Sequence, residues 1–114
     1  MIWKIFLYTT CRNEKPVKEF IKSLSSTSIA KVSHTIDLLK ECGSFLKMPH
    51  SKKIKDNLYE LRIRGEQEIR IFYTFKNRDI YLLHAFQKQS QKTPQKELKI
   101  ALERIKLLTK LLHI

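Results

Sequence analysis

Three consecutive segments of alternating apolar and polar residues constrain the fold of this chain more than any other feature. They are short runs separated by polar turns, and they cover residues 58–64, 69–75 and 80–86. In the first run, Tyr59, Leu61 and Ile63 alternate with charged side chains, which is typical of a strand with one buried face. The third run is apolar on both sides, as expected for a central strand. The short connections predict that these strands pair antiparallel.

The residues before these strands predict one further strand and two helices. Residues 2–9 are rich in β-branched and aromatic side chains, which favours a strand. Apolar residues then recur at helical spacing over 14–25 and, after a serine-rich interruption, from 29 until Gly43 supplies a C-terminal stop. Residues 45–56 contain a proline and several lysines, a pattern typical of a connection.

A last helix is predicted over residues 94–112, because Thr93 and Pro94 offer an N-cap and a proline at the first helical position. With 114 residues, of which 42% are hydrophobic, the chain can bury the core of one domain. We therefore expect a single α+β domain over 1–114. Its N-terminal strand and helix pair should pack on one face of an antiparallel sheet, followed by a C-terminal helix.

The net charge of the chain points to a polyanionic partner. It carries 23 Lys and Arg against 11 Asp and Glu, a formal charge of +12, which attracts nucleic acid and, more weakly, anionic lipid. No apolar run reaches the roughly 18 to 20 residues that cross a bilayer, and the N-terminal segment lacks the features of a signal peptide. We expect a cytoplasmic protein whose cysteines, Cys11 and Cys42, are reduced.

The sequence signatures of common enzyme sites are missing. With two glycines, the chain cannot build a glycine-rich loop that cradles phosphates. Its four histidines are scattered and lack the spacing of metal ligands. We therefore expect neither a metal nor a cofactor.

Basic residues are concentrated on the predicted sheet. Arg62 and Arg64 lie two positions apart on one strand, so both side chains leave the same face, and Arg70 follows on the next strand. Because the opposite face is apolar and must cover the core, we expect these arginines to face solvent together with Lys88 and Lys92. Guanidinium groups bind phosphate bidentately, so this surface suits a phosphodiester backbone. The alternative is a solvated surface without a ligand.

Four segments, taken in order, resemble a known family. They are Leu58–Arg64 (LYELRIR), Ile69–Tyr73 (IRIFY), Leu82–Lys88 (LLHAFQK) and Gln91–Pro94 (QKTP), the last leading to Glu97. Together they resemble the phage-derived HigB-like branch of the RelE/ParE toxin superfamily. The resemblance covers residues 58–104 closely, and the preceding strand and helix pair fit the same order of elements.

The resemblance implies a toxin of a type II toxin–antitoxin pair that cleaves messenger RNA on the ribosome without a metal or cofactor. By position, Arg70 resembles the arginine that stabilises the reacting phosphate, and Arg62 and Arg64 belong to the strand segment that holds RNA. Lys88 and Lys92 belong to the basic loop after the last strand. The implied partners are a HigA-like helix-turn-helix antitoxin, the ribosome and messenger RNA, with no role for a membrane.

The groups that transfer protons are not defined by the resemblance. RelE carries a lysine where this chain has Glu60, so the general base of RelE is not transferable. Cleavage without a metal requires removal of the 2′-hydroxyl proton, stabilisation of a five-coordinate phosphorus and protonation of the 5′ oxygen. Arg70 is expected to stabilise the charge. Lys88 and His84 are both candidates for proton transfer, and a structural role for His84 is the alternative.

A binding module that does not cut RNA is the second function open to this fold. It would be a DNA gyrase inhibitor resembling ParE, or a regulator that binds nucleic acid. ParE-type toxins lack the full set of phosphate-binding basic residues on the sheet face. The presence of Arg62, Arg64, Arg70 and Lys88 therefore favours the ribonuclease.

The predicted C-terminal helix carries two apolar stripes. One is sufficient to dock the helix on its own domain and comprises Leu98, Ala101, Leu102, Ile105, Leu108 and Leu112. The second includes Leu107 and Leu111, and we expect the antitoxin or a second copy of the chain to cover it. The alternative is that the helix lies in a deeper groove of its own domain.

Overall fold

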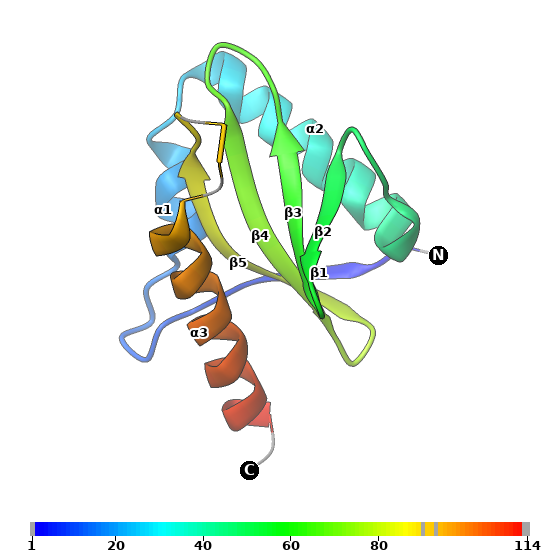
Figure 1. The fold of residues 1–114 in the computed structure, drawn as a ribbon, viewed down its shortest axis with the longest axis vertical. Helices are drawn as coiled ribbons and strands as arrows, with labels where there is room; N and C mark the ends of the chain where they lie inside the picture. The colour runs from blue at the N-terminus through cyan, green and yellow to red at the C-terminus, as the bar shows by residue number, and fades with distance from the viewer. Residues whose placement is uncertain (1, 90, 93, 113–114) are drawn as a thin grey trace.

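The computed structural model describes residues 2–89, 91–92 and 94–112, which form an α+β domain with a five-stranded sheet (Figure 1). The strands lie in the order β1-β5-β4-β3-β2. Along the chain the elements are β1 (Lys4–Leu7), α1 (Pro16–Lys22), α2 (Ser26–Cys42), the short 3₁₀ helix η1 (Gly43–Phe45), β2 (Ser51–Lys55), β3 (Leu58–Ile63), β4 (Ile69–Lys76), β5 (Asp79–Gln87) and α3 (Gln95–Leu112). The predicted α+β class and C-terminal helix are confirmed.

The three alternating segments form β3, β4 and β5, which pair antiparallel as predicted. Asn77 and Arg78 connect β4 to β5, and both have positive φ values, of 51° and 70°. Two such residues in a row make the tight hairpin turn whose twist matches that of the strands. This turn sets the register that places Lys76 opposite Asp79.

The prediction of a connection over 45–56 is wrong, because Ser51–Lys55 form the edge strand β2. This strand pairs antiparallel with β3, and Lys52 lies opposite Glu60. The sequence of β2 has one apolar residue, Ile54, and three lysines, so it shows no apolar alternation, and lysines are typical of edge strands that resist pairing with another molecule. This segment is a strand because it pairs with the free edge of β3, and its local sequence pattern does not predict that.

The prediction that the sheet is antiparallel is also wrong in part, because β1 pairs parallel with β5. Ile5 lies opposite Ile80 in this pair. A parallel pair requires a long connection, and here the chain passes through both N-terminal helices and three strands before β5. No short turn constrains the direction of β1, so the local sequence did not reveal it.

Helix α2 begins earlier than predicted because Ser25 caps it. The Ser25 side chain accepts a hydrogen bond of 3.2 Å from the backbone N–H of Ser28. The serine-rich segment therefore opens the helix rather than interrupting it. The predicted stop at Gly43 is confirmed, since its φ is 53° and a Cβ there would lie 2.0 Å from Nε1 of Trp3.

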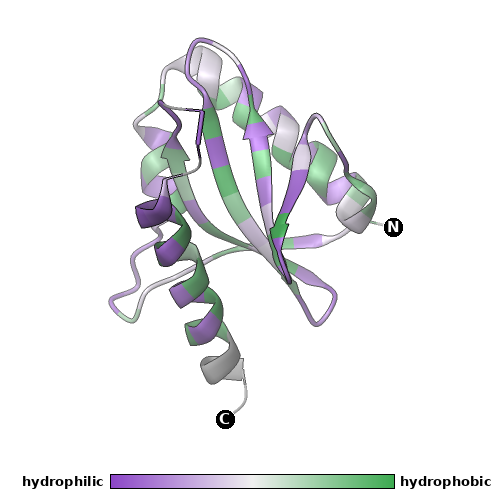
Figure 2. Cartoon of the chain, viewed as in Figure 1, coloured by the Kyte–Doolittle hydropathy of each residue, from purple (hydrophilic) through white to green (hydrophobic). Residues whose placement is uncertain are grey.

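Helices cover both faces of the sheet. On one face, α1 and α2 bury the main core, in which Val17, Val32 and Leu39 pack with Leu61 and Ile71. On the other face, α3 covers a smaller core made of Leu58, Phe72, Leu83, Phe86 and Ala101. Figure 2 shows that hydrophobic residues alternate with hydrophilic ones around α3, as this half-buried position requires.

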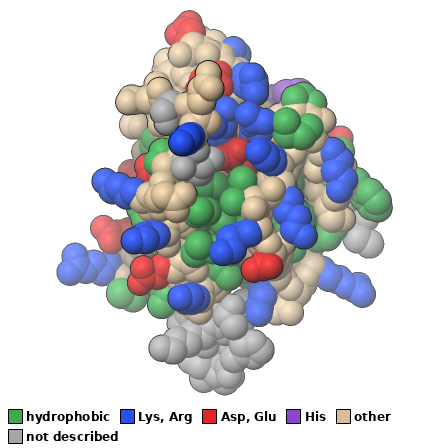
Figure 3. Space-filling model, viewed as in Figure 1, with side chains coloured by type: hydrophobic (Ala, Val, Ile, Leu, Met, Phe, Trp, Pro, Cys, Tyr) green, Lys and Arg blue, Asp and Glu red, His purple; other side chains and the backbone are tan. Residues whose placement is uncertain are grey.

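Helix α3 lies over β4 and β5 and leaves the β2 and β3 side of its face more open (Figure 1). In Figure 3, Lys and Arg side chains surround a central area of hydrophobic side chains on this face. The open part of the face is where the basic residues of the candidate site lie.

Candidate functional site

A depression of 540 Å³ lies at the end of the open sheet face, beside the turn between β3 and β4. Its lining comprises Arg62, Arg64, Glu68, Arg70, Lys88, Gln89 and Gln91. Four of the basic residues singled out in the sequence therefore lie together, although they come from two strands, the turn after β3 and the loop after β5. Such a concentration of cations in one concavity favours binding of an anion with several phosphates.

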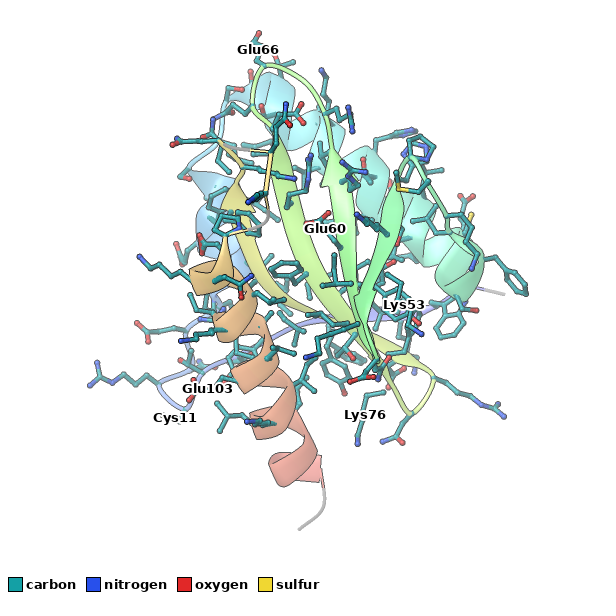
Figure 4. The ribbon with its side chains drawn as sticks, viewed as in Figure 1. Cys11, Lys53, Glu60, Glu66, Lys76 and Glu103 are labelled. Carbon is teal, nitrogen blue, oxygen red and sulfur yellow. The ribbon has the colours of Figure 1, made fainter. Side chains whose placement is uncertain are left out.

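Glu60 lies at the centre of this charge cluster. On the neighbouring strands, Arg62 pairs directly with Arg70 in the register of β3 and β4. The Glu60 Oε1 atom is 3.8 Å from Nε of Arg62 and 3.8 Å from Nε of Arg70. Figure 4 shows Glu60 in the middle of the sheet rather than at its edge. One carboxylate therefore holds both arginines, one on each strand.

The expectation that Arg70 faces solvent is wrong, because its side chain is only 3% exposed. Its Nη1 donates a hydrogen bond to the carbonyl oxygen of Ile69 at 3.0 Å, and its Nη2 donates one to Oε1 of Glu68 at 3.2 Å. The Lys88 backbone N–H donates to the carbonyl of Glu68 at 2.7 Å, which extends the pairing of β4 and β5 and holds the start of the loop after β5 beside this corner. Glu60 and Glu68 thus compensate the buried charge.

Three buried polar atoms of this cluster have no hydrogen-bond partner among the residues that the structure describes. They are Oε2 of Glu60, Nε of Arg62 and Nε of Arg70. Buried polar atoms in folded proteins are nearly always satisfied, and the exceptions call for an explanation such as a functional role. Two of these residues, Arg62 and Arg70, line the depression, so unsatisfied hydrogen-bonding groups lie directly beside its cation-lined surface.

Glu68 is the second carboxylate of the depression. Burial alone would raise its pKa, but the hydrogen bond from the Gly65 backbone N–H, the hydrogen bond from Arg70 and the charges of Arg70 and Arg64 lower the pKa below its ordinary value of 4.5. Oε1 and Oε2 of Glu68 are both engaged by these donors, at 3.2 Å and 3.3 Å. Glu68 therefore remains an anion that orients Arg70, and it is a poor proton acceptor.

The two predicted loop lysines occupy different positions. Lys88 is half-buried and lines the depression, whereas Lys92 is exposed and is not among the described residues of its lining. Lys88 can therefore reach a ligand at the Arg70 corner.

His84 lies under helix α3 and does not line the depression as far as the structure describes its walls. Its Nε2 forms a hydrogen bond of 2.7 Å with Oε1 of Glu97, and Nη1 of Arg104 lies 3.4 Å from its Nδ1. Burial lowers the pKa of His84 below its ordinary value of 6.5, although Glu97 opposes this shift. The structure separates His84 from the basic residues with which the sequence grouped it.

The C-terminal helix docks through the first of its two apolar stripes, as predicted. Leu98, Leu102, Ile105 and Leu108 pack against the core around Ala101. Leu107 lies outside this contact and is 41% exposed. The side chain of Leu111 lies outside the described part of the structure.

Glu60 is the residue of this site that the sequence analysis missed as a functional candidate. It appeared only as a departure from RelE, although its position offered a usable signal. Glu60 and Arg62 are two apart on one strand, so they share a face, and a lone carboxylate among arginines on a half-buried strand predicts an ion pair.

The described residues contain neither a membrane-spanning helix nor a cluster of metal ligands. Every helix in that part of the chain is too short or too polar to cross a bilayer. No three His, Cys, Asp or Glu side chains gather there as metal ligands would. Independence from metal stays a prediction.

Comparison with known proteins identifies the family. The family model described as "Phage derived protein Gp49-like (DUF891)" matches residues 19–106, which span α2, β2 to β5 and much of α3. A search of curated proteins finds no match. Since the family model covers well over half of the chain, the protein belongs to the Gp49-like family of phage-derived proteins, a toxin-like family of the RelE type.

Proposed function

We propose that the protein is the HigB-like toxin of a type II toxin–antitoxin pair and that it cleaves messenger RNA on the ribosome without a metal ion. The observation that carries this proposal is the cation-lined depression, whose lining includes the buried Arg70, with Glu60 paired to that arginine at 3.8 Å. Cleavage of a phosphodiester without a metal needs a proton acceptor and a fixed positive charge. This pair offers both within one site.

Binding of the substrate rests on the rim of the depression. Arg62, Arg64 and Lys88 supply cations that replace the counterions of the phosphate backbone. Guanidinium groups bind a phosphate through two parallel hydrogen bonds, which fixes its orientation as well as its position. Lys92 extends this basic surface along the strand of RNA.

The proposed cleavage reaction uses the ion pairs that Glu60 forms with Arg62 and Arg70. A phosphate that draws the guanidinium groups of Arg62 and Arg70 away from Glu60 frees its Oε1, which then accepts the proton of the 2′-hydroxyl. The 2′ oxygen attacks phosphorus, Arg70 stabilises the five-coordinate intermediate, and the bond to the 5′ oxygen breaks. Lys88 donates a proton to that oxygen, because it lines the depression whereas His84 lies under α3. The products are a 2′,3′-cyclic phosphate and a 5′-hydroxyl end.

The proposal includes a partner and a compartment. A helix-turn-helix antitoxin of the HigA-like kind neutralises the toxin in an oligomeric complex, and the protein acts in the cytoplasm, where ribosomes translate. The exposed Leu107 is the candidate contact on α3, together with Leu111 further along the same helix. The second apolar stripe of this helix in the sequence, to which both leucines belong, supports a contact with another protein.

Mapping of transcript ends after induction tests the proposed function. Cells that produce the protein should accumulate new 5′-hydroxyl ends inside translated codons, and cells that produce the Glu60→Gln variant should not. Intact transcripts together with a DNA-damage response would instead support a gyrase inhibitor. Growth inhibition without either signature would support a regulator that binds nucleic acid.

A further inference from the structure

A second hollow lies directly beside the depression, between helix α2 and strand β3. It has a volume of 390 Å³, and its polar lining includes Lys31 and His34 of α2, His50 before β2, and the pair Arg62 and Arg64. The volume falls within the range of about 300 to 1,000 Å³ that is typical of sites for small molecules. The proposed mechanism uses none of the α2 side chains of this hollow.

Arg62 and Arg64 line both concavities, so they form a shared wall. The backbone N–H of Arg62 donates to the carbonyl of His50 at 2.8 Å, which holds the loop before β2 against the end of β3. Nη1 of Arg62 contacts Sδ of Met48 at 3.4 Å, on the side of this loop. A phosphate chain that crosses the two arginines therefore passes from the depression into the hollow.

The walls of the hollow combine flat polar rings with apolar surface. The imidazole rings of His34 and His50 line the hollow. Its apolar surface comes from Ala30, Pro49 and the buried Ile63. Phosphate alone would require cations and backbone donors, not apolar walls. A nucleobase requires a flat stacking surface and an apolar contact, with polar groups at its edge.

Lys31 closes the end of the hollow that lies next to the turn between β3 and β4. A Cβ placed on Gly65 would lie 2.5 Å from Nζ of Lys31, so this side chain reaches from α2 to the turn that follows Arg64. An ammonium group at this position meets either the edge of a base or the next phosphate of the strand. The hollow thus has a volume and a lining that suit one nucleotide between α2 and the shared wall.

We propose that this hollow binds the base of the nucleotide adjacent to the bond that is cut, and that it contributes the preference of the protein for a base at that position. The inference rests on the proposed function, because it takes the depression as the place of cleavage. It adds a base-binding subsite to the phosphate-binding surface, with Lys31, His34 and His50 as its residues.

Photo-crosslinking locates the bases of a bound substrate. The probe is a short messenger RNA, free or bound on ribosomes, with 2′-deoxy nucleotides at the cleaved codon and one 4-thiouridine placed in turn on either side of it. Crosslinks from one side should map to residues 26–42 or to His50. Crosslinks confined to the residues of the depression would overturn the inference and leave the proposed function standing. An absence of crosslinks to the whole chain would overturn both.

Substitution of Lys31 and His34 provides the second test. Both side chains are exposed, so Lys31→Ala/His34→Ala should leave the fold intact. Loss of a stacking contact should reduce the ratio of kcat/KM between preferred and other bases at one flanking position by about tenfold, while cleavage itself continues. Lys18→Ala on α1 is the matched control, because it removes one exposed positive charge elsewhere. An unchanged base preference in the double variant would contradict the proposal that this hollow binds a base.

Discussion

The Glu60 carboxylate on β3 lies 3.8 Å from Nε of Arg70 on β4, and each of these side chains is only 3% exposed. A buried ion pair gains little net stability unless its remaining polar atoms are satisfied, because both charges lose their hydration. Here Oε2 of Glu60 and Nε of Arg70 have no hydrogen-bond partner among the described residues. The pair therefore adds little net stability to the sheet by itself, and its two members can be tested separately.

Glu60→Gln should reduce the rate of messenger RNA cleavage by about 10² to 10⁴, because an amide of similar size cannot accept the 2′-hydroxyl proton. The measurement is single-turnover cleavage of a defined transcript. Glu66→Gln, at the exposed turn between β3 and β4, is the control that makes the same chemical change outside the cluster (Figure 4). A Glu60→Gln variant that cleaves at the unaltered rate would remove Glu60 from proton transfer.

Arg70→Ala should lower both activity and stability. Removal of one preorganised donor to the reacting phosphate costs about 10² to 10³ in rate. The free energy of unfolding should also fall, because Glu60 keeps only Arg62 as a buried counter-charge. Urea denaturation measures the stability. Glu60→Gln/Arg70→Met should recover part of it, since no uncompensated carboxylate remains, and strictly additive losses would contradict the coupling of the two residues.

Neutralising Lys88 and Lys92 should weaken binding to RNA and flatten its salt dependence. Each phosphate contact on a single strand contributes about 0.7 to the slope of log affinity against log salt, so Lys88→Ala/Lys92→Ala should reduce the slope by up to about 1.4. Fluorescence anisotropy with a 2′-deoxy oligonucleotide measures this. Lys18→Ala/Lys22→Ala on α1 removes the same charge from another surface. Equal slopes in the two double variants would assign Lys88 and Lys92 to the solvated surface.

Acidification should destabilise the protein through His84. Because burial lowers the pKa of His84 in the folded state, the unfolded chain takes up the proton more readily as the pH falls below 6.5. The free energy of unfolding is therefore fully retained above this pH and declines below it, down to the folded-state pKa. His84→Gln should flatten the dependence between pH 7.5 and 5, as followed by urea midpoints. Glu97→Gln should steepen it, because Glu97 raises the pKa of His84.

Leu107→Ser should weaken antitoxin binding without unfolding the toxin. Leu107 is 41% exposed, so the substitution should change the free energy of unfolding by no more than about 0.5 kcal/mol. Leu108→Ser on the docked stripe is the contrast, and it should destabilise the domain because Leu108 packs against the smaller core. Titration of toxin with antitoxin measures the first effect. Unaltered affinity of the Leu107→Ser variant would place the partner surface elsewhere.

Much of this fold is predictable from local patterns. The period of two over residues 58–86 identified β3 to β5, and the short turns established that they pair antiparallel. Gly43 marked the end of α2, because only a residue without a side chain fits its positive φ beside Trp3. These features depend on a few neighbouring residues, so the sequence contains them directly.

The same period placed Arg62, Arg64 and Arg70 on one side of the sheet, and the structure brings the three together with Lys88. Alternation determines which face a side chain leaves. It does not determine whether that face is open to solvent, because the segments that bury a sheet face are distant in the sequence. The expectation of an exposed Arg70 failed for this reason, since its side chain is only 3% exposed and pairs with Glu60 and Glu68.

Only the tertiary structure decided the features that depend on partners remote in the chain. Ser51–Lys55 became a strand because β3 offered a free edge, and β1 took its direction from β5. Glu60 acquired its two buried arginines only when β3 paired with β4, and His84 left the basic group when α3 placed Glu97 against it. The sequence alone determined which faces the charges occupy, whereas packing determined which charges meet, because burial and distance are properties of the assembled chain.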